Sequence, residues 1–394
     1  MLQDITNILT INAGSSSIKF ALYKKQDDLV QQLSGVIERI GLTDAVFTIK
    51  EQNNNSKQKI NAPDLHTAIV FLIEWMEKQE WFHHTNAIGH RIVHGMHHTH
   101  AEIVTDVLLN ELNNISNYDP DHLPAEIQII QLIKQRYPDI LQVACFDTSF
   151  HTTIPIVAKK IAIPKKYYEE GLQRYGFHGI SYSYLLQQLK KDDEVRSYGR
   201  VILAHLGNGA SMAGVKNGKC MDTTMGFTPA GGLVMSTRSG DIDPGTAWYL
   251  MQKGIDAKKF NDIINHQSGL LGISGISADM YDLLQLKKEN ENAALAVDIF
   301  CYQAKKYIGA YTAALGGLDI LVFSGGIGEH SPEVRSEICN DLEFMGIELD
   351  EIKNMNNELI ISTEASKVTV RVIKTNEEVM IASMVDDILD ESTK

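Results

Sequence analysis

The chain has 394 residues, of which 44% are hydrophobic and 22% charged; this composition is typical of a globular protein, and the length predicts two compact domains. The formal net charge of −14 disfavours a nucleic-acid partner, because affinity for phosphate backbones comes from clustered Lys and Arg. No apolar run approaches the roughly 20 residues that cross a bilayer, so no membrane span is expected.

The N-terminus, MLQDITNIL, has an acidic residue rather than a basic cluster before its short apolar run, and no small-residue cleavage site follows. The four cysteines, Cys145, Cys220, Cys301 and Cys339, form no C-x-x-C pair, which argues against a zinc ribbon, a redox motif or a disulfide framework. We therefore expect reduced thiols and a cytoplasmic location.

The first third of the chain begins with strand-like runs: ILTIN, IKFALY, LVQQLSGVIERI and AVFTIKEQ, with the polar stretch NNNSKQK as a hairpin tip. These runs favour an antiparallel start. Strands and helices then alternate: helix HTAIVFLIEWMEKQ, strand NAIGHRIVHG, helix PAEIQIIQLIKQRY and strand QVACFD.

A similar order restarts at residue 201, where VILAHLGNGASMAGVKNGKCMDTTMG reads as three strands joined by two turns. A long helix is expected over about 290–315, then strand DILVFSGG, a helix from Pro332, strand VTVRVIK and helix EEVMIASMVDDIL. INAGSSSIKF and HLGNGASMAG correspond, since each has Asn, Gly and Ser between apolar strands. The pattern predicts two duplicated βββαβα-like halves facing each other across a cleft; two unrelated hairpins are the alternative.

Both small-residue turns are suited to bind phosphate, because Gly and Ser let backbone N–H groups approach an anion closely. A flexible hairpin loop is the alternative for either turn. The strand ending in SGGIGE and leading to a helix offers free amides and a helix dipole, which suits a nucleotide. It matches neither the P-loop nor the Rossmann pattern, and a plain strand–helix connection remains possible.

The irregular stretch MGFTPAGGLVMSTRSGDIDPG contains Arg238 as its only base. A guanidinium on a glycine-rich loop is a candidate clamp for carboxylate or phosphate, although a pair with Asp241 or Asp243 is the alternative. Arg91, in GHRIVHG, and His178, in YGFHGISY, lie in segments that likewise mix apolar residues with glycine. Each histidine by itself favours a structural role, and Asp147 after strand QVACFD could simply cap a turn.

The run HGMHHTH contains His94, His97, His98 and His100, which is suggestive of a metal site. No acidic or cysteine partner stands nearby at the familiar zinc spacings. The sequence therefore favours a solvated loop, and no metal is predicted there.

Together these segments resemble the acetate kinase family, within the larger group of acetate and sugar kinases, Hsp70 proteins and actin. The resemblance runs through NAGSSSIKF, GHRIVHG, FDTSFH, YGFHG, HLGNGAS, RSGDIDPG, SGGIGE and TNEE. It implies an α/β fold of two duplicated RNase H-like (actin-like ATPase) domains of βββαβαβα type flanking a nucleotide cleft. The N-terminal lobe would comprise 1–149 plus a returning helix at 379–394, and the nucleotide-binding and dimerisation lobe 150–378.

The implied reaction is reversible transfer of the ATP γ-phosphoryl group to acetate, giving acetyl phosphate and ADP for acetyl-CoA biosynthesis, by a homodimer that uses Mg²⁺ or Mn²⁺. The implied metal residues are Asn12 and Glu377. The implied catalytic residues are Asp147, His178, Arg238, Arg91 and His122, and the substrate residues Arg91, Val93, Phe177 and Pro229. The implied nucleotide residues are Ser15, Ser17, Lys19, His205, Leu206, Gly207, Asn208, Gly209, Asp279, Met280, Tyr281, Gly325, Gly326, Ile327, Gly328 and Glu329.

A carboxylate acceptor is already ionised at neutral pH and needs no general base, whereas a sugar hydroxyl does. We therefore expect Asp147 to orient an Arg or hydrated Mg²⁺. Three departures from the family pattern stand out: Met96 replaces a Gly, Asp121-His122-Leu123-Pro124 replaces Leu-His-Asn-Pro, and Ala278-Asp279-Met280-Tyr281 lacks the Arg of S-D-x-R.

Two rival functions remain at this point. A propionate kinase of the same fold differs by one methylene in the substrate, which is worth only about 1 to 3 kcal/mol in an apolar pocket. Val93, rather than a smaller residue, favours acetate. An Hsp70-like or actin-like nucleotide-driven binding protein is the rival from another class, but it would leave Arg91 and Arg238 without a role.

Overall fold

The computed structural model describes residues 6–14, 16–51, 54–192 and 194–392. The chain divides into two compact units, Met1–Ser149 with Asn376–Lys394 (unit 1) and Phe150–Thr375 (unit 2). Within the described ranges, no helix combines the length and apolar character needed to cross a membrane.

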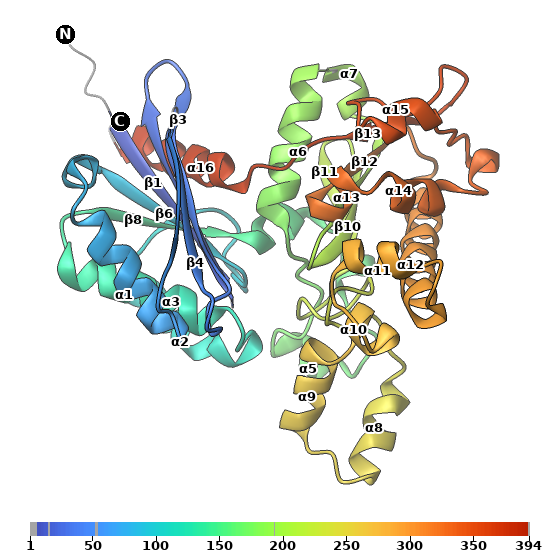
Figure 1. Ribbon diagram of the computed structural model, residues 1–394, viewed down its shortest axis with the longest axis horizontal. Coiled ribbons are helices and arrows are strands. Elements are labelled where there is room, and N and C mark those ends of the chain that lie inside the picture. The colour runs from blue at the N-terminus through green and yellow to red at the C-terminus, as the bar shows by residue number, and fades with distance from the viewer. Residues whose placement is uncertain (1–5, 15, 52–53, 193, 393–394) are drawn as a thin grey trace. The chain divides into compact units, whose positions relative to one another are not determined.

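Unit 1 is built on an eight-stranded sheet with the order β5-β4-β3-β2-β1-β6-β8-β7 (Figure 1). Strands β1 to β5 are antiparallel neighbours, whereas β1, β6 and β8 run parallel to one another. The bounds are β1 Thr6–Ala13, β2 Ser17–Lys25, β3 Leu29–Glu38, β4 Val46–Glu51, β5 Asn54–Lys59, β6 Ala87–Ile92, β7 Glu102–Ile103 and β8 Leu141–Phe146.

Helices cover both faces of this sheet: α1, α2 and α3 lie on one side and α16 on the other (Figure 1). Side-chain caps start α1 and α2, where Asp64 accepts from the Thr67 N–H and Thr105 from the Leu108 N–H. Gly89 lets α16 approach closely, because a Cβ there would lie 2.6 Å from a methyl group of Ile381 and from one of Val385. The bounds are α1 Leu65–Met76, η1 Glu80–His84, α2 Asp106–Ile115, η2 Ser116–Tyr118, α3 Leu123–Arg136, η3 Asp147–Thr153 and α16 Glu377–Ser392.

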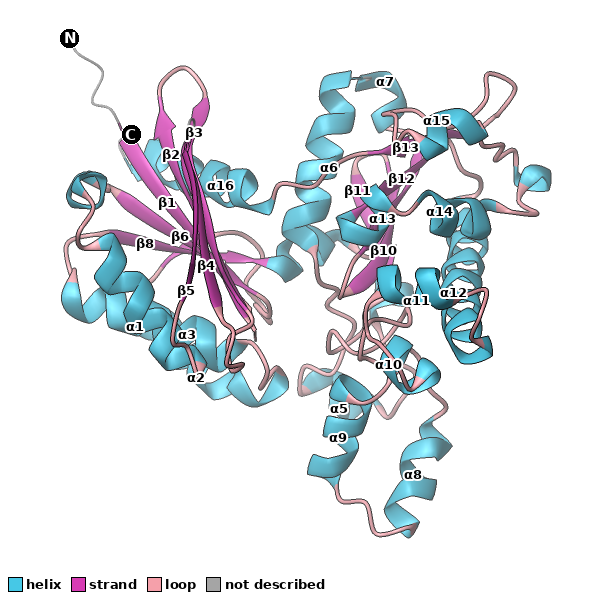
Figure 2. Cartoon of the chain, viewed as in Figure 1, coloured by secondary structure: helices cyan, strands magenta, loops and turns pink. Residues whose placement is uncertain are grey.

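Unit 2 contains a five-stranded sheet with the order β11-β10-β9-β12-β13. Strands β9, β10 and β11 are antiparallel neighbours, while β9, β12 and β13 are parallel. Helices α6 and α12 flank this sheet on opposite sides (Figure 2). The strand bounds are β9 Arg200–Leu206, β10 Ala210–Lys216, β11 Lys219–Thr223, β12 Ile320–Ser324 and β13 Thr369–Val372.

The other elements of unit 2 are short helices around this sheet and the 25-residue α12. Their bounds are α4 Ile156–Lys159, α5 Lys165–Glu169, α6 Gly179–Asp192, α7 Glu194–Ser197, α8 Pro244–Gln252, α9 Ala257–His266, α10 Gly269–Ser274, α11 Met280–Leu286, α12 Glu291–Leu315, α13 Gly325–His330, α14 Pro332–Cys339, η4 Glu343–Met345 and α15 Glu351–Met355.

The two sheets share one topology, since β3-β2-β1-β6-β8 of unit 1 corresponds in order and direction to β11-β10-β9-β12-β13 of unit 2. The turn between β1 and β2 therefore corresponds to the turn between β9 and β10, as INAGSSSIKF and HLGNGASMAG predict. The expected duplication is confirmed at the level of the strands.

Two expectations about local structure were wrong. NNNSKQK is mostly the edge strand β5, which pairs with β4 through main-chain hydrogen bonds although its side chains are exposed. Helix α14 begins at Pro332 as expected, but the glycines of SGGIGE form a further short helix, α13, that the sequence did not predict. The HGMHHTH segment is not wholly solvated: His94 and His98 are buried, because α2 and β7 fold back over it.

Candidate active site

Arg91 and Asp147 form the central ion pair of unit 1. Arg91 is on β6, Asp147 follows β8, and these neighbouring parallel strands end at the same edge of the sheet. Asp147 is fully buried, and its Oδ2 accepts hydrogen bonds from Arg91 Nε at 3.1 Å and NH2 at 2.6 Å. Burial alone would lower the pKa of Arg91, but the carboxylates of Asp147, Glu377 and Glu126 raise it. Arg91 is therefore a permanent, oriented cation.

Oxygen-bearing side chains gather beside this pair at the end of β1 and the start of α16. Asn12 donates from Nδ2 to Glu377 Oε2 at 2.9 Å, and Arg91 NH1 lies 3.4 Å from Asn12 Oδ1. Burial raises the pKa of the neighbouring Glu378, and Glu377 raises it further. Glu378 Oε1 has no hydrogen-bond partner among the described residues. Amide and carboxylate oxygens are the ligands that Mg²⁺ prefers, so this group fits such an ion.

A second buried carboxylate, Glu126 on α3, holds the chain after β6. Both of its oxygens accept from the Val93 N–H, at 3.1 and 3.3 Å. Burial holds the pKa of Glu126 well above its usual value, although Arg91 opposes the shift. His122, at the start of α3, pairs through Nδ1 with Asp119 at 2.8 Å. This bond fixes the His122 ring despite the altered Asp-His-Leu-Pro motif.

In unit 2, the turn after β9 brings His178 and Arg238 together. A Cβ on Gly209 would lie 3.1 Å from His178 Nε2 and 3.8 Å from Arg238 NH1, so only glycine leaves this space open. Arg238 NH1 also donates to the carbonyl of Pro229 at 3.3 Å. The two acids considered as partners for Arg238 have other roles: Asp243 caps α8, and Asp241 accepts from Gly232 N and Tyr307.

The His178 ring is fixed by a polar network. Its backbone has a φ of 58°, in the left-handed region that is strained for histidine, as functional sites often are. Nδ1 lies 2.9 Å from Ser211 Oγ, and the ring stacks on His205 with centroids 4.4 Å apart. His205 in turn is held by Ser181 at 2.8 Å. Nε2 of His178 is thereby directed toward Gly209.

Helix α13 begins against the same turn. Gly325 has a φ of 75°, and a Cβ there would lie 2.6 Å from the Leu206 carbonyl oxygen. A Cβ on Gly207 would lie 3.7 Å from the Gly326 nitrogen, so the turn packs on the N-terminus of α13. Glu329 is buried and accepts from the backbone N–H groups of Gly325 and Thr375, each at 3.0 Å. The glycine-rich turn therefore packs on the start of α13, where Glu329 holds the Gly325 N–H and the Gly209 carbonyl holds the Gly207 N–H.

The remaining expected site residues fall in several places. Asp279 caps α11 and Met280 is buried, whereas Tyr281 is exposed. Phe177 and Pro229 are buried in unit 2, and Val93 is buried in unit 1. Lys19 pairs in register with Asn12 on β1. Ser17 begins β2, and Ser15 lies outside the described residues.

Several supporting residues were not anticipated from the sequence: Glu126, Glu378, Asp119, Ser181 and Ser211. Glu126 gave a usable signal, since helical spacing places it on the buried face of α3 with Leu123 and Ile130. Asp119 bonds to His122 three residues away, whereas the partners of Ser181 and Ser211 are set by strand register and by contacts distant in the sequence.

The comparisons with known proteins agree with this architecture. A model of the acetokinase family matches residues 7–383. Acetate kinase of Thermoanaerobacterium thermosaccharolyticum is 43% identical, and the alignment covers 97% of this chain and 99% of that protein. The crystal structure of Porphyromonas gingivalis acetate kinase aligns with a TM-score of 0.86 at 37% identity, covering 98% of this chain and 100% of that chain.

A propionate kinase structure from Francisella tularensis aligns comparably, with a TM-score of 0.89 at 36% identity, covering 96% of this chain and 98% of that chain. These matches confirm the expected fold class of two actin-like ATPase folds. The chain is a member of the acetokinase family.

Proposed function

We propose that the protein is an acetate kinase that reversibly transfers the γ-phosphoryl group of ATP to acetate, forming acetyl phosphate and ADP. Asn12 and Glu377, with Glu378 beside them, would hold Mg²⁺, which neutralises phosphate charge when bound. In unit 2 the turn at Gly207–Gly209 and the first residues of α13 would lie against the nucleotide, as the family resemblance implies. The remaining nucleotide contacts are those that the family resemblance implies.

The observation that carries this proposal is the juxtaposition of Arg238, His178 and Gly209 in unit 2. Phosphoryl transfer requires positioned cations and hydrogen-bond donors around charge that spreads over the phosphoryl oxygens. Arg238 supplies a permanent charge, His178 supplies a ring nitrogen, and the turn supplies unobstructed backbone. Arg238 would contact the phosphoryl group that is transferred, and His178 would help to stabilise the charge on its oxygens.

The hydrogen bonds that Asp147 accepts support a carboxylate, rather than a hydroxyl, as the phosphoryl acceptor. Its Oδ2 accepts two hydrogen bonds from Arg91, so this oxygen is engaged as an orienting group rather than as a proton acceptor. A hydroxyl acceptor would require a general base, whereas acetate is already ionised. The family resemblance implies Arg91 for the acetate carboxylate, and Val93, Phe177 and Pro229 for its methyl group.

Propionate kinase is the second candidate, because the Francisella propionate kinase structure matches this chain as well as the acetate kinase structure does. Val93 favours the smaller substrate. Homodimer formation and a cytoplasmic location remain predictions from the sequence.

The direct test is to incubate the protein with ATP, Mg²⁺ and acetate, propionate or butyrate, and to trap acyl phosphate as the hydroxamate with hydroxylamine. We expect kcat/KM to fall in the order acetate, propionate, butyrate, with roughly a tenfold step for the first methylene. A higher value for propionate would favour the second candidate. ATP hydrolysis without carboxylate-dependent hydroxamate would contradict both.

A further inference from the structure

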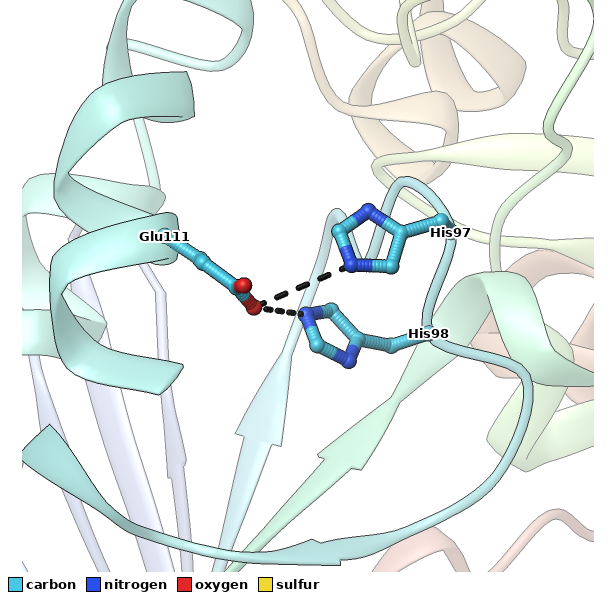
Figure 3. A group of neighbouring side chains, drawn as sticks. All are labelled: His97, His98 and Glu111. Carbon is cyan, nitrogen blue, oxygen red and sulfur yellow. Dashed lines mark ion pairs between the residues drawn. The ribbon is translucent and has the colours of Figure 1, made fainter. Parts of the chain in front are cut away.

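The histidine-rich loop of unit 1, residues 94–100, contains a group of metal-binding side chains that phosphoryl transfer does not use. His97 and His98 on this loop and Glu111 on α2 place one ligand atom each within 4.8 Å of one another (Figure 3). His98 Nε2 lies 3.2 Å from Glu111 Oε2, and His97 Nε2 lies 3.7 Å from the same oxygen. Glu111 is the acidic partner that sequence spacing did not reveal.

The His98 ring is oriented as metal-binding histidines usually are. Its Nδ1 lies 2.9 Å from Glu102 Oε1, an arrangement in which Nδ1–H donates to the carboxylate and Nε2 keeps its lone pair. The ring is only 7% exposed and stacks on Phe146, with centroids 5.0 Å apart and planes 10° apart. Burial, stacking and the Glu102 bond together fix the direction of Nε2.

Nε2 of His98 is also a buried atom without a satisfied hydrogen bond. Among the described residues no group makes a hydrogen bond of acceptable geometry with it, although Glu111 Oε2 is close. In the tautomer set by Glu102, the Nε2 lone pair faces carboxylate lone pairs, which is repulsive unless a cation lies between them. This unpartnered, nearly buried nitrogen is the second observation that indicates a bound cation.

The geometry points to a transition-metal site, and we propose that His97, His98 and Glu111 bind a divalent ion of the Zn²⁺ class. Two imidazoles and one carboxylate suit Zn²⁺, Co²⁺ or Ni²⁺, whereas Mg²⁺ and Ca²⁺ prefer oxygen ligands. Ligand atoms of a tetrahedral zinc site lie about 3.3 Å apart, given bonds of about 2.0 to 2.1 Å. The His98–Glu111 distance already matches, and His97, which is 70% exposed, is free to rotate inward.

Such an ion would tie the loop to α2 and leave a coordination position open to solvent, since Glu111 is 42% exposed. The site is separate in its chemistry from the oxygen-rich group at Asn12 and Glu377. It also lies against Phe146, the residue before Asp147, so an ion there would stabilise the segment that carries the Asp147 carboxylate.

The test uses untagged full-length protein freed of metals with a chelator and titrated with Zn²⁺ by calorimetry. We expect one Zn²⁺ per chain and, at zinc a hundredfold above Kd, a rise of roughly 5 to 10 °C in the melting temperature of unit 1. Co²⁺ should give the visible absorption of a tetrahedral N/O site. Mg²⁺ at the same concentration should not compete.

Single variants assign the ligands. His97→Gln, His98→Gln and Glu111→Gln should each weaken Zn²⁺ binding by more than tenfold, and Glu102→Gln by about 10- to 100-fold through loss of ring orientation. His100→Gln is the matched control, because this exposed histidine of the same loop bonds to Thr99 and lies outside the group. Its affinity should equal that of the wild type.

Two outcomes would overturn the site: folded wild-type protein that binds no Zn²⁺, or equal affinity in the wild type and in the His97 and Glu111 variants. Absence of binding would mean that His98 pairs with Glu102 and Glu111 without a metal ion. The His97 and Glu111 variants change exposed side chains, so a folding defect in His98→Gln would not remove the test. Circular dichroism of each variant provides the folding control.

Discussion

Asp147 should act on catalysis only through Arg91. The two side chains share two hydrogen bonds, of 2.6 and 3.1 Å to one carboxylate oxygen, and their side chains are 0% and 13% exposed. If Asp147 positions the guanidinium, its removal matters only while Arg91 is present. The informative set is Asp147→Asn, Arg91→Ala and the combined variant, each compared with the wild type.

The size of the effect follows from what remains around Arg91. Breaking a buried ion pair by removing one partner typically costs about 3 to 5 kcal/mol. Glu377 also stabilises the Arg91 charge, so we expect only about 2 to 3 kcal/mol for Asp147→Asn. At 1.4 kcal/mol per factor of ten, this corresponds to a fall in kcat of roughly 30- to 150-fold.

The assay is steady-state formation of acyl phosphate at saturating ATP and acetate, with circular dichroism to confirm folding. The combined variant should have a kcat within about threefold of Arg91→Ala alone, because the lost positioning has nothing left to act on. The reasoning would be refuted if the two single effects multiplied, since Asp147 would then act independently, as a base or a metal ligand.

Three further predictions concern single residues. Arg238→Ala should lower kcat by about 10³-fold or more with the fold intact, and Arg238→Lys should recover only part of this loss in the same assay. A kcat of Arg238→Ala within a few-fold of wild type would remove Arg238 from the mechanism. Met96→Gly should raise the free energy of unfolding by about 1 kcal/mol, because Met96 has a φ of 50° in the left-handed region. A lower urea midpoint for the variant would show that the side-chain contacts of Met96 outweigh the strain. Glu126→Gln should become progressively more stable than wild type as pH rises above about 4.5. Burial raises the folded pKa of Glu126, so the folded state retains a proton that the unfolded chain releases. Urea midpoints of both proteins at pH 5 and pH 8 test this, and the opposite trend would refute it.

Features set by strand order were predictable from the sequence. Alternation of apolar runs and small-residue turns indicated the β1–β2 and β9–β10 turns, because both connect adjacent antiparallel strands. Arg91 lies near the end of β6 and Asp147 directly after β8, and neighbouring parallel strands end at one edge of a sheet. Strand position alone therefore brings these two side chains together.

Features set by packing between distant segments were not predictable. Ser211 on β10 reaches His178 only through the register of β9 and β10, and Glu111 meets His98 only because α2 folds back over the loop after β6. The glycines of SGGIGE suggested a loop, since Gly disfavours helix, but Glu329 accepts from the Gly325 N–H and supports an immediate helix start. At this position the hydrogen bond from a side chain within the helix outweighs the low helix propensity of glycine.

The central claim is that the acetate carboxylate attacks the γ-phosphorus of ATP, and ¹⁸O-labelled acetate tests it most directly. The protein is incubated with [¹⁸O₂]acetate, ATP and Mg²⁺, and the product is cleaved with hydroxylamine. Hydroxylamine attacks the carbonyl carbon and releases phosphate with the bridging oxygen. Mass spectrometry should then find one ¹⁸O in each phosphate released in an acetate-dependent manner. Phosphate that contains no ¹⁸O, formed at the same rate without acetate, would show that water is the acceptor and would contradict the proposed function.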